Sequence, residues 1–179
     1  FGDAHAPGHV GNPADLDDLQ VTSVTASDHV QVNKPFTVNY TVTNTGPGAT
    51  PPNQSTWDTY VYLSEDTLFD PSRDRFIGTF SHAGALAPGA SFTKSATFTA
   101  PSDMVGTFYV LVKTDPESFT APVGKVLETN EKNNIGLSAA MIIDQPPPSD
   151  LQVANIQFVP TAGKVGDTIS VTYTVTNVS

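Results

Sequence analysis

The chain has 179 residues and carries 18 Asp and Glu against 8 Lys and Arg, which gives a formal net charge of −10 at pH 7. An acidic chain without clustered Lys and Arg argues against binding to a nucleic-acid phosphate backbone. The absence of Cys excludes disulfides, thiolate metal sites and cysteine nucleophiles, and no apolar run in the sequence approaches the length of a membrane-spanning helix.

The periodic part of the sequence begins at Leu19. Residues 1–17 contain Gly, Pro, Asp and His without a sustained apolar period, and we interpret them as an N-terminal arm or linker. From Phe36 to Thr43 apolar and polar residues alternate, which is typical of a strand with one buried face. Further strands are expected at residues 57–63, 92–99 and 108–112, around Val126, and at residues 135–143.

Turn signals rich in Gly, Pro, Asn and Asp separate these runs, and no stretch of the sequence keeps a helical period with caps. About seven short strands over roughly a hundred residues predict an all-β fold, an immunoglobulin-like antiparallel β-sandwich at residues 18–144. Four aromatic side chains fall at inward positions and are expected in its core: Phe36, Trp57, Phe92 and Phe108.

A proline-rich linker separates this unit from a repeat of its beginning. The sequence Gln-Pro-Pro-Pro-Ser at residues 145–149 favours the extended polyproline II conformation, which acts as a stiff spacer. After it, VTYTVTN at residues 171–177 repeats VNYTVTN at residues 38–44. We therefore interpret residues 150–179 as the first two strands of a second copy.

Two strands cannot close a sandwich by themselves, because an isolated hairpin is marginally stable in water. Three explanations remain open for the partial repeat. The chain is a segment of a longer protein, or the repeat completes its sheet by pairing with another subunit, as in donor-strand assembly, or it is a disordered remnant. The mass of the purified chain distinguishes the first two.

The combination and order of these motifs resembles the CARDB domain, the "cell adhesion related domain found in bacteria". The resemblance implies an immunoglobulin-like sandwich in large exported prokaryotic surface proteins, in several copies, located outside the cell or on its surface. It implies no catalytic activity. The stretches that carry it lie at residues 18–21, 38–46, 57–64, 106–115 and 128–134, and residues 150–179 match as a partial copy.

An acidic loop at residues 63–78 is the main candidate for a metal site. Asp66, Asp70 and Asp74 are spaced four apart, and calcium takes roughly 6–8 oxygen ligands, which acidic loops supply. We therefore expect calcium as the cofactor of this loop, with these three carboxylates as ligands. The alternative is a turn in which the Asp side chains accept hydrogen bonds from backbone N–H groups, with Arg73 and Arg75 neutralising them.

A second candidate lies between the last two expected strands, where residues 128–134 read Glu-Thr-Asn-Glu-Lys-Asn-Asn. Asn tolerates left-handed backbone and hydrogen-bonds its own turn, so the pattern favours a structured hairpin connection. The alternative is a second cation site or a loop that faces a partner.

The sequence contains no Ser-x-x-Lys, no Gly-x-Ser-x-Gly and no phosphate-binding Gly loop, so we do not expect an enzyme. The first hypothesis is a non-catalytic structural repeat of an exported prokaryotic surface protein, adhesin-like or filament-forming. Its expected partners are neighbouring repeats or identical subunits, joined by strand pairing. One alternative is a recognition module that binds a glycan or protein through residues 46–56 and 64–76, with Tyr60 and Tyr62 exposed. The other is an accessory domain of a secreted enzyme.

Overall fold

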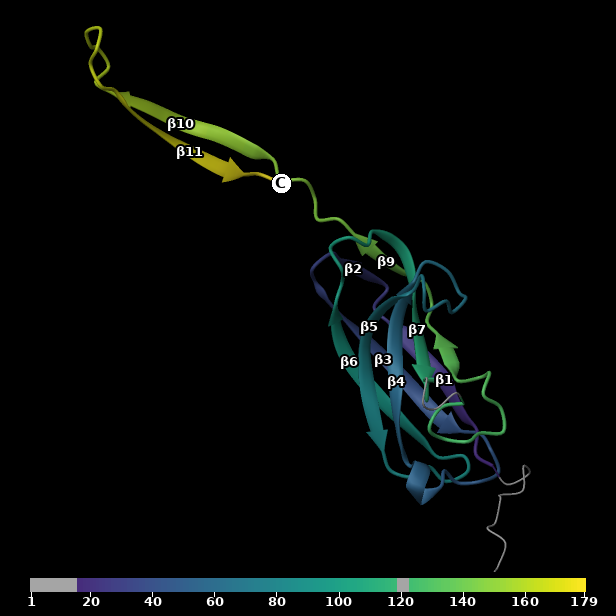
Figure 1. The fold of residues 1–179 in the computed structure, drawn as a ribbon. Helices are drawn as coiled ribbons and strands as arrows, with labels where there is room; N and C mark the ends of the chain where they lie inside the picture. Colours follow the sequence, from purple (N-terminus) through teal and green to yellow (C-terminus); the bar gives the residue numbers. More distant parts are fainter. Residues whose placement is uncertain (1–15, 119–122) are drawn as a thin grey trace, which may run out of the picture. The chain divides into compact units, whose positions relative to one another are not determined.

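The computed structural model describes residues 16–118 and 123–179, and the chain divides into two units, Phe1–Asp144 and Gln145–Ser179 (Figure 1). Most of the expected N-terminal arm, residues 1–15, lies outside the described residues. In the described part, no helix is long and apolar enough to cross a membrane. The strands are β1 (Leu19–Ala26), β2 (His29–Gln31), β3 (Pro35–Asn44), β4 (Thr56–Ser64), β5 (Arg75–Ala83), β6 (Ser91–Thr99), β7 (Gly106–Thr114), β8 (Ile135–Leu137), β9 (Met141–Asp144), β10 (Leu151–Val159) and β11 (Ser170–Asn177), and a 3-10 turn covers Pro52–Gln54.

The first unit is a sandwich of two sheets. One sheet has the strand order β1-β3-β6, and the other has the order β2-β9-β7-β4-β5 with β8 paired to β7. Its strand pairs are antiparallel except β2 with β9, which run parallel. This arrangement confirms the predicted immunoglobulin-like β-sandwich.

The core lies between the two sheets and follows the alternation seen in the sequence. In β3, Phe36, Val38, Tyr40 and Val42 are each at most 2% exposed, while the residues between them are exposed or half-buried. Trp57 of β4 is fully buried in the same cluster. Burial of an apolar side chain of this size contributes roughly 1.5–3 kcal/mol. Of the four aromatic residues expected inside, three are buried and Phe92 is half-buried against the cluster.

Three expected elements differ from the structure. Strand β5 was not expected, and its first four residues fall within the segment expected to be a loop. It lies at the edge of its sheet and all its residues are exposed or half-buried, so the alternation of apolar and polar residues is weak. No strand forms around Val126, which is buried in a loop instead. The expected strand at residues 135–143 is split into β8 and β9. Between them the Ser138 hydroxyl accepts a hydrogen bond from the Val110 amide at 2.9 Å, which interrupts the backbone pairing with β7.

The second unit contains one antiparallel hairpin, β10–β11 (Figure 1). Its pairing repeats that of β1–β3: Val153 faces Val175 as Val21 faces Val42. Whereas Val21 and Val42 are 6% and 0% exposed, Val153 and Val175 are 56% and 50% exposed. The hairpin therefore carries the same apolar side chains as β1–β3 without a second sheet to cover them.

Candidate functional site

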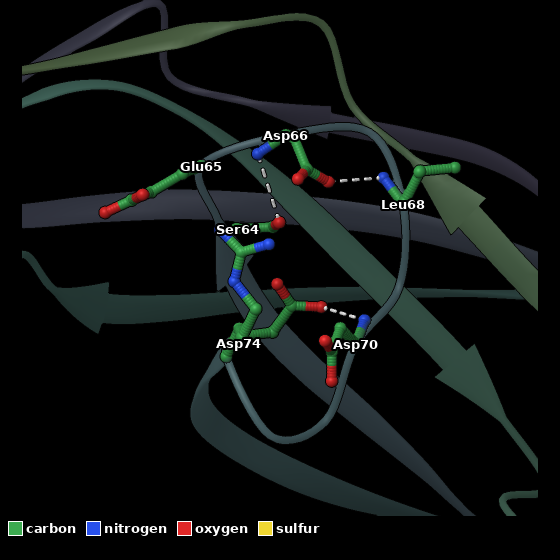
Figure 2. Close-up of a pocket in the computed structure, with 7 residues that line it drawn as sticks. Ser64, Glu65, Asp66, Leu68, Asp70 and Asp74 are labelled. Atoms are coloured by element: carbon green, nitrogen blue, oxygen red, sulfur yellow. Dashed lines mark hydrogen bonds between the residues drawn. The ribbon is translucent and has the colours of Figure 1, made fainter.

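The acidic loop between β4 and β5 surrounds a pocket at the surface of the first unit (Figure 2). The three carboxylates expected to bind calcium all belong to this pocket. The side chains that line it are Ser64, Glu65, Asp66, Leu68, Asp70, Arg73 and Asp74.

Each of these three carboxylates accepts a hydrogen bond from the backbone of its own loop. Asp66 Oδ1 accepts a hydrogen bond from the backbone amide of Leu68 at 2.8 Å, and Asp74 Oδ2 accepts one from the backbone amide of Asp70 at 2.7 Å. Asp70 Oδ1 accepts from the Ser72 hydroxyl at 2.6 Å and from the Ser72 amide at 2.9 Å, and these bonds lower the pKa of Asp70 below its usual value. This is the geometry expected of the alternative, a turn built by Asp side chains.

Across residues 16–118 and 123–179, no group of three or more His, Asp or Glu side chains is arranged to hold a metal ion. Calcium binding by Asp66, Asp70 and Asp74 stays a prediction. A cation here would have to compete with the backbone amides for carboxylate oxygens.

Phe69 of the same loop and Phe76 of β5 cover Tyr62 of β4. The ring centroid of Phe69 lies 5.1 Å from that of Tyr62, and the ring of Phe76 lies 5.5 Å from it. Tyr62 is therefore 8% exposed, and the expectation that it is exposed is wrong. The Tyr60 and Tyr62 rings meet at 62°, so they do not form the flat aromatic platform of a glycan site.

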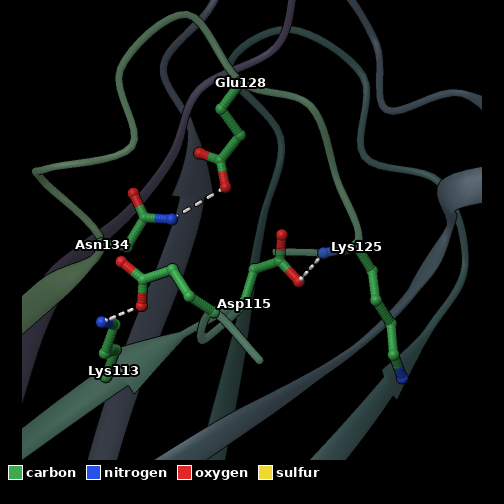
Figure 3. A network of polar contacts seen from close by, with 6 residues as sticks. Lys113, Asp115, Lys125, Glu128 and Asn134 are labelled. Carbon is green, nitrogen blue, oxygen red and sulfur yellow. Dashed lines mark hydrogen bonds and ion pairs between the residues drawn. The ribbon is translucent and has the colours of Figure 1, made fainter. Parts of the chain in front are cut away.

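A second group of polar side chains lies where β7 ends. Asp115 follows this strand with a φ of 42° and is 2% exposed. Its carboxylate accepts hydrogen bonds from the backbone amide of Lys125 at 2.9 Å (Figure 3) and from that of Val126 at 2.8 Å. A Cβ at Gly124 would lie 2.2 Å from Asp115 Oδ2, and Gly124 has a φ of +82°, so this approach requires glycine. Asp115 thus fixes the loop that leads to residues 128–134.

Glu128 is buried at this end of the sandwich and is 5% exposed. Its carboxyl group accepts a hydrogen bond from the side-chain amide of Asn134 at 2.8 Å (Figure 3) and another from the backbone amide of Leu19 at 2.5 Å. Burial, together with repulsion from Glu131 and Asp115, raises the pKa of Glu128 to about 9. The connection at residues 128–134 is therefore structured, as its first interpretation expected, and it ties the segment before β8 to β1. It is not a hairpin connection, because the described residues around Val126 that precede it form no strand.

Asp17 joins this cluster from the segment before β1, and burial raises its pKa. It is 1% exposed, and its backbone carbonyl accepts the amide hydrogen of Thr129 at 2.8 Å. The sequence pointed to residues 128–134 but to neither Asp17 nor Asp115. Each of these two stands next to a strand end, which is a weak signal, because acidic residues are common in turns.

The CARDB family model matches residues 16–136 of the chain. Among solved structures, the crystal structure of the CARDB domain of the PF1109 protein from Pyrococcus furiosus, in complex with di-metal ions, is 20% identical, with a TM-score of 0.51 over 72% of this chain and 89% of that one. The solution structure of the same domain is 21% identical, with a TM-score of 0.51 over 74% of this chain and 99% of that one. These likenesses show the fold. A comparison with curated protein sequences finds no match.

A β-glucosidase from Listeria innocua also resembles the chain, at 15% identity and a TM-score of 0.40, over 72% of this chain and 16% of the enzyme. This likeness is too weak to support an argument about catalysis.

Proposed function

Because the chain belongs to the CARDB family, a family of non-catalytic domains, we propose that it is a structural repeat of an exported prokaryotic surface protein. In this proposal the sandwich is one of several linked units located outside the cell or on its surface. We propose further that the surface protein is adhesin-like or forms filaments. Its partners are neighbouring repeats or identical subunits.

The observation that carries the proposal is the repetition of one hairpin with its pairing intact. Leu19 pairs with Asn44, and Leu151 pairs with Asn177. The capping hydrogen bond is repeated as well, since Asn44 Oδ1 and Asn177 Oδ1 each accept a backbone amide, from Asp18 and Asp150, at 3.1 Å. Matched registers and matched caps support two copies of one repeat, as in a tandem array.

The energetics of the first unit support modular use. Its core cluster consists of residues of its own strands and loops, so a further copy can be added without new contacts between repeats. Residues 145–149 are exposed and contain three consecutive prolines, which limit bending. Exposed Thr and Ser and a net charge of −10 oppose aggregation between copies.

The open face of β10–β11 supports completion by further strands. Leu151, Phe158 and Tyr173 are 64%, 52% and 59% exposed, and monomeric proteins rarely leave a contiguous apolar face of this kind uncovered. The covering sheet comes from a longer version of the same chain or from another subunit by strand pairing. Calcium binding by the loop of Asp66, Asp70 and Asp74 also remains a proposal, supported by the spacing of the carboxylates.

An antibody raised against residues 16–144 tests the proposal in cells of the source organism. We expect the antibody to label intact cells, and to detect on a denaturing gel a polypeptide much heavier than 179 residues. An antibody against a cytoplasmic enzyme serves as the control and should label permeabilised cells alone. Labelling by both antibodies solely after permeabilisation would contradict a surface location. A native polypeptide of about 179 residues would favour completion by a second subunit.

A further inference from the structure

Four side-chain oxygens in the described residues are buried without a hydrogen-bond partner, and all of them lie at the end of the sandwich where residues 128–134 meet the segment before β1. They are both carboxylate oxygens of Asp17 and the amide oxygens of Asn133 and Asn134. Asp17 and Asn134 are 1% and 3% exposed. Buried acceptors without donors are costly, at about 1–3 kcal/mol each or more when charged, so a group of them in one place requires an explanation.

The orientation of the Asn133 amide is fixed by its nitrogen, which donates to the Asp18 carboxylate at 3.0 and 3.2 Å. Turning this amide over would direct its oxygen at the Asp18 carboxylate and lose both bonds. Asn134 Nδ2 donates to Glu128 Oε1 at 2.8 Å (Figure 3). In this arrangement both amide oxygens are acceptors that need a donor or a cation.

The charges around these oxygens are negative. Asp17 is repelled by Asp18 and Asp115, and Glu131 is repelled by Asp17. Burial raises the pKa of Asp17 and of Glu131, and repulsion among the carboxylates adds to this effect. The charged groups whose electrostatic effect reaches Asp17 are thus all acidic. A bound cation would offset the repulsion between these carboxylates and would supply a partner for the unpaired oxygens.

We propose that this end of the sandwich binds a divalent cation of the calcium class, with oxygen ligands from Asp17 and from the Asn133–Asn134 pair. Carboxylate and amide oxygens are the ligands that calcium prefers. Asp17 has both oxygens available, so it can bind in a bidentate manner. Two of the proposed ligands are Asn side chains. The described residues contain no group of three or more acidic or His side chains arranged for a metal, so the site would be one of mixed carboxylate and amide ligands. It is also distinct from the loop of Asp66, Asp70 and Asp74.

Binding at this site would tie the start of the sandwich to its end. The Thr129 amide donates to the Asp17 carbonyl, and the Leu19 amide donates to Glu128, so the cation adds a third link between the segment before β1 and residues 128–134. These segments are more than a hundred residues apart in the chain. We therefore expect a stabilising cation rather than one that takes part in a reaction.

Thermal unfolding of the full chain, with chelator and with added calcium, tests the proposal. A ligand present at about 100 times its Kd should raise the melting temperature by roughly 5–10 °C. Asp17→Asn removes the carboxylate ligand and should weaken calcium binding at least about tenfold. In chelator this variant should be at least as stable as the unmodified chain, because an unpaired buried charge is removed. The matched control, Asp66→Asn in the other acidic loop, should keep the part of the calcium response that Asp17→Asn removes.

Terbium luminescence locates the ion without a variant. The indole of Trp57, the single tryptophan, donates to the Thr114 hydroxyl at 3.1 Å, and the Thr114 amide donates to the Asn134 carbonyl at 2.9 Å. Ser64, where the other acidic loop begins, lies at the opposite end of β4 from Trp57. We expect excitation of Trp57 to sensitise bound terbium and added calcium to abolish the signal.

Two results would overturn the proposal. One is a calcium response that Asp17→Asn leaves intact and Asp66→Asn removes. The other is a chain whose melting temperature and terbium emission do not respond to either ion, which would mean that protons or water satisfy Asp17 and the two amides. Neither result depends on whether the protein lies on the cell surface.

Discussion

Trp57→Ala should lower the free energy of unfolding of the first unit by about 3–5 kcal/mol, the range found when a large aromatic side chain is removed from a core. Trp57 is fully buried between the sheets, and its ring centroid lies 6.3 Å from that of Phe92. The substitution leaves a cavity and removes the indole N–H that donates to the Thr114 hydroxyl. Urea unfolding followed by far-ultraviolet circular dichroism measures the loss, since the variant has no tryptophan fluorescence.

Leu68→Ala is the matched control, because Leu68 is a large apolar residue that is 74% exposed. Its effect should stay within about 0.5 kcal/mol. A loss below about 1 kcal/mol for Trp57→Ala would contradict a core that is centred between the two sheets.

Asp115→Ala should destabilise the first unit by about 2–4 kcal/mol, because it leaves the backbone amides of Lys125 and Val126 without their acceptor. The loop that includes the buried Val126 depends on these two bonds, as no strand forms there. Removal of a buried carboxylate near Glu128 offsets part of the loss. Urea unfolding gives the magnitude, and hydrogen exchange at Lys125 and Val126 should become faster.

Asp115→Asn is the control for charge, because it keeps one acceptor oxygen and the shape of the side chain. Because the side-chain nitrogen of Asn would face one of the two backbone amides, Asp115→Asn should keep one of the two bonds and cost less than Asp115→Ala. No loss of stability in Asp115→Ala, or exchange rates at Val126 that stay unchanged, would show that the carboxylate does not hold this loop.

The strands that could be predicted from the sequence are those in which buried and exposed residues alternate. In β3 the alternation runs along the whole strand, because one face of the strand packs on the opposite sheet. In β4 it holds over Thr56–Tyr60 and then ends, because Val61–Ser64 are all buried. Strand β5 escaped prediction because it is an edge strand with Phe76 on the outer face, 51% exposed, and Gly78 where the ring of Phe98 approaches. An outward aromatic residue and a glycine weaken a period of two.

The candidate sites were less predictable, because they depend on residues that meet through the fold. Asp17 contacts Thr129, and Glu128 contacts Leu19, across more than a hundred residues of sequence. Local patterns identify an acidic turn such as residues 64–74 and cannot show that a buried Asp will lack a partner. The position of Tyr62 was missed for a similar reason, since Phe69 covers it from a loop rather than from a strand.

Native-state hydrogen exchange on the dilute full chain tests the central claim most directly, namely that the first unit is a complete sandwich and that β10–β11 begin a second one. We predict that amides of β3 and β7 exchange through global unfolding of the first unit, whereas amides of β10 and β11 exchange faster by orders of magnitude, since their apolar face is uncovered. Protection of β10 and β11 equal to that of β3 in a monomer would contradict the account.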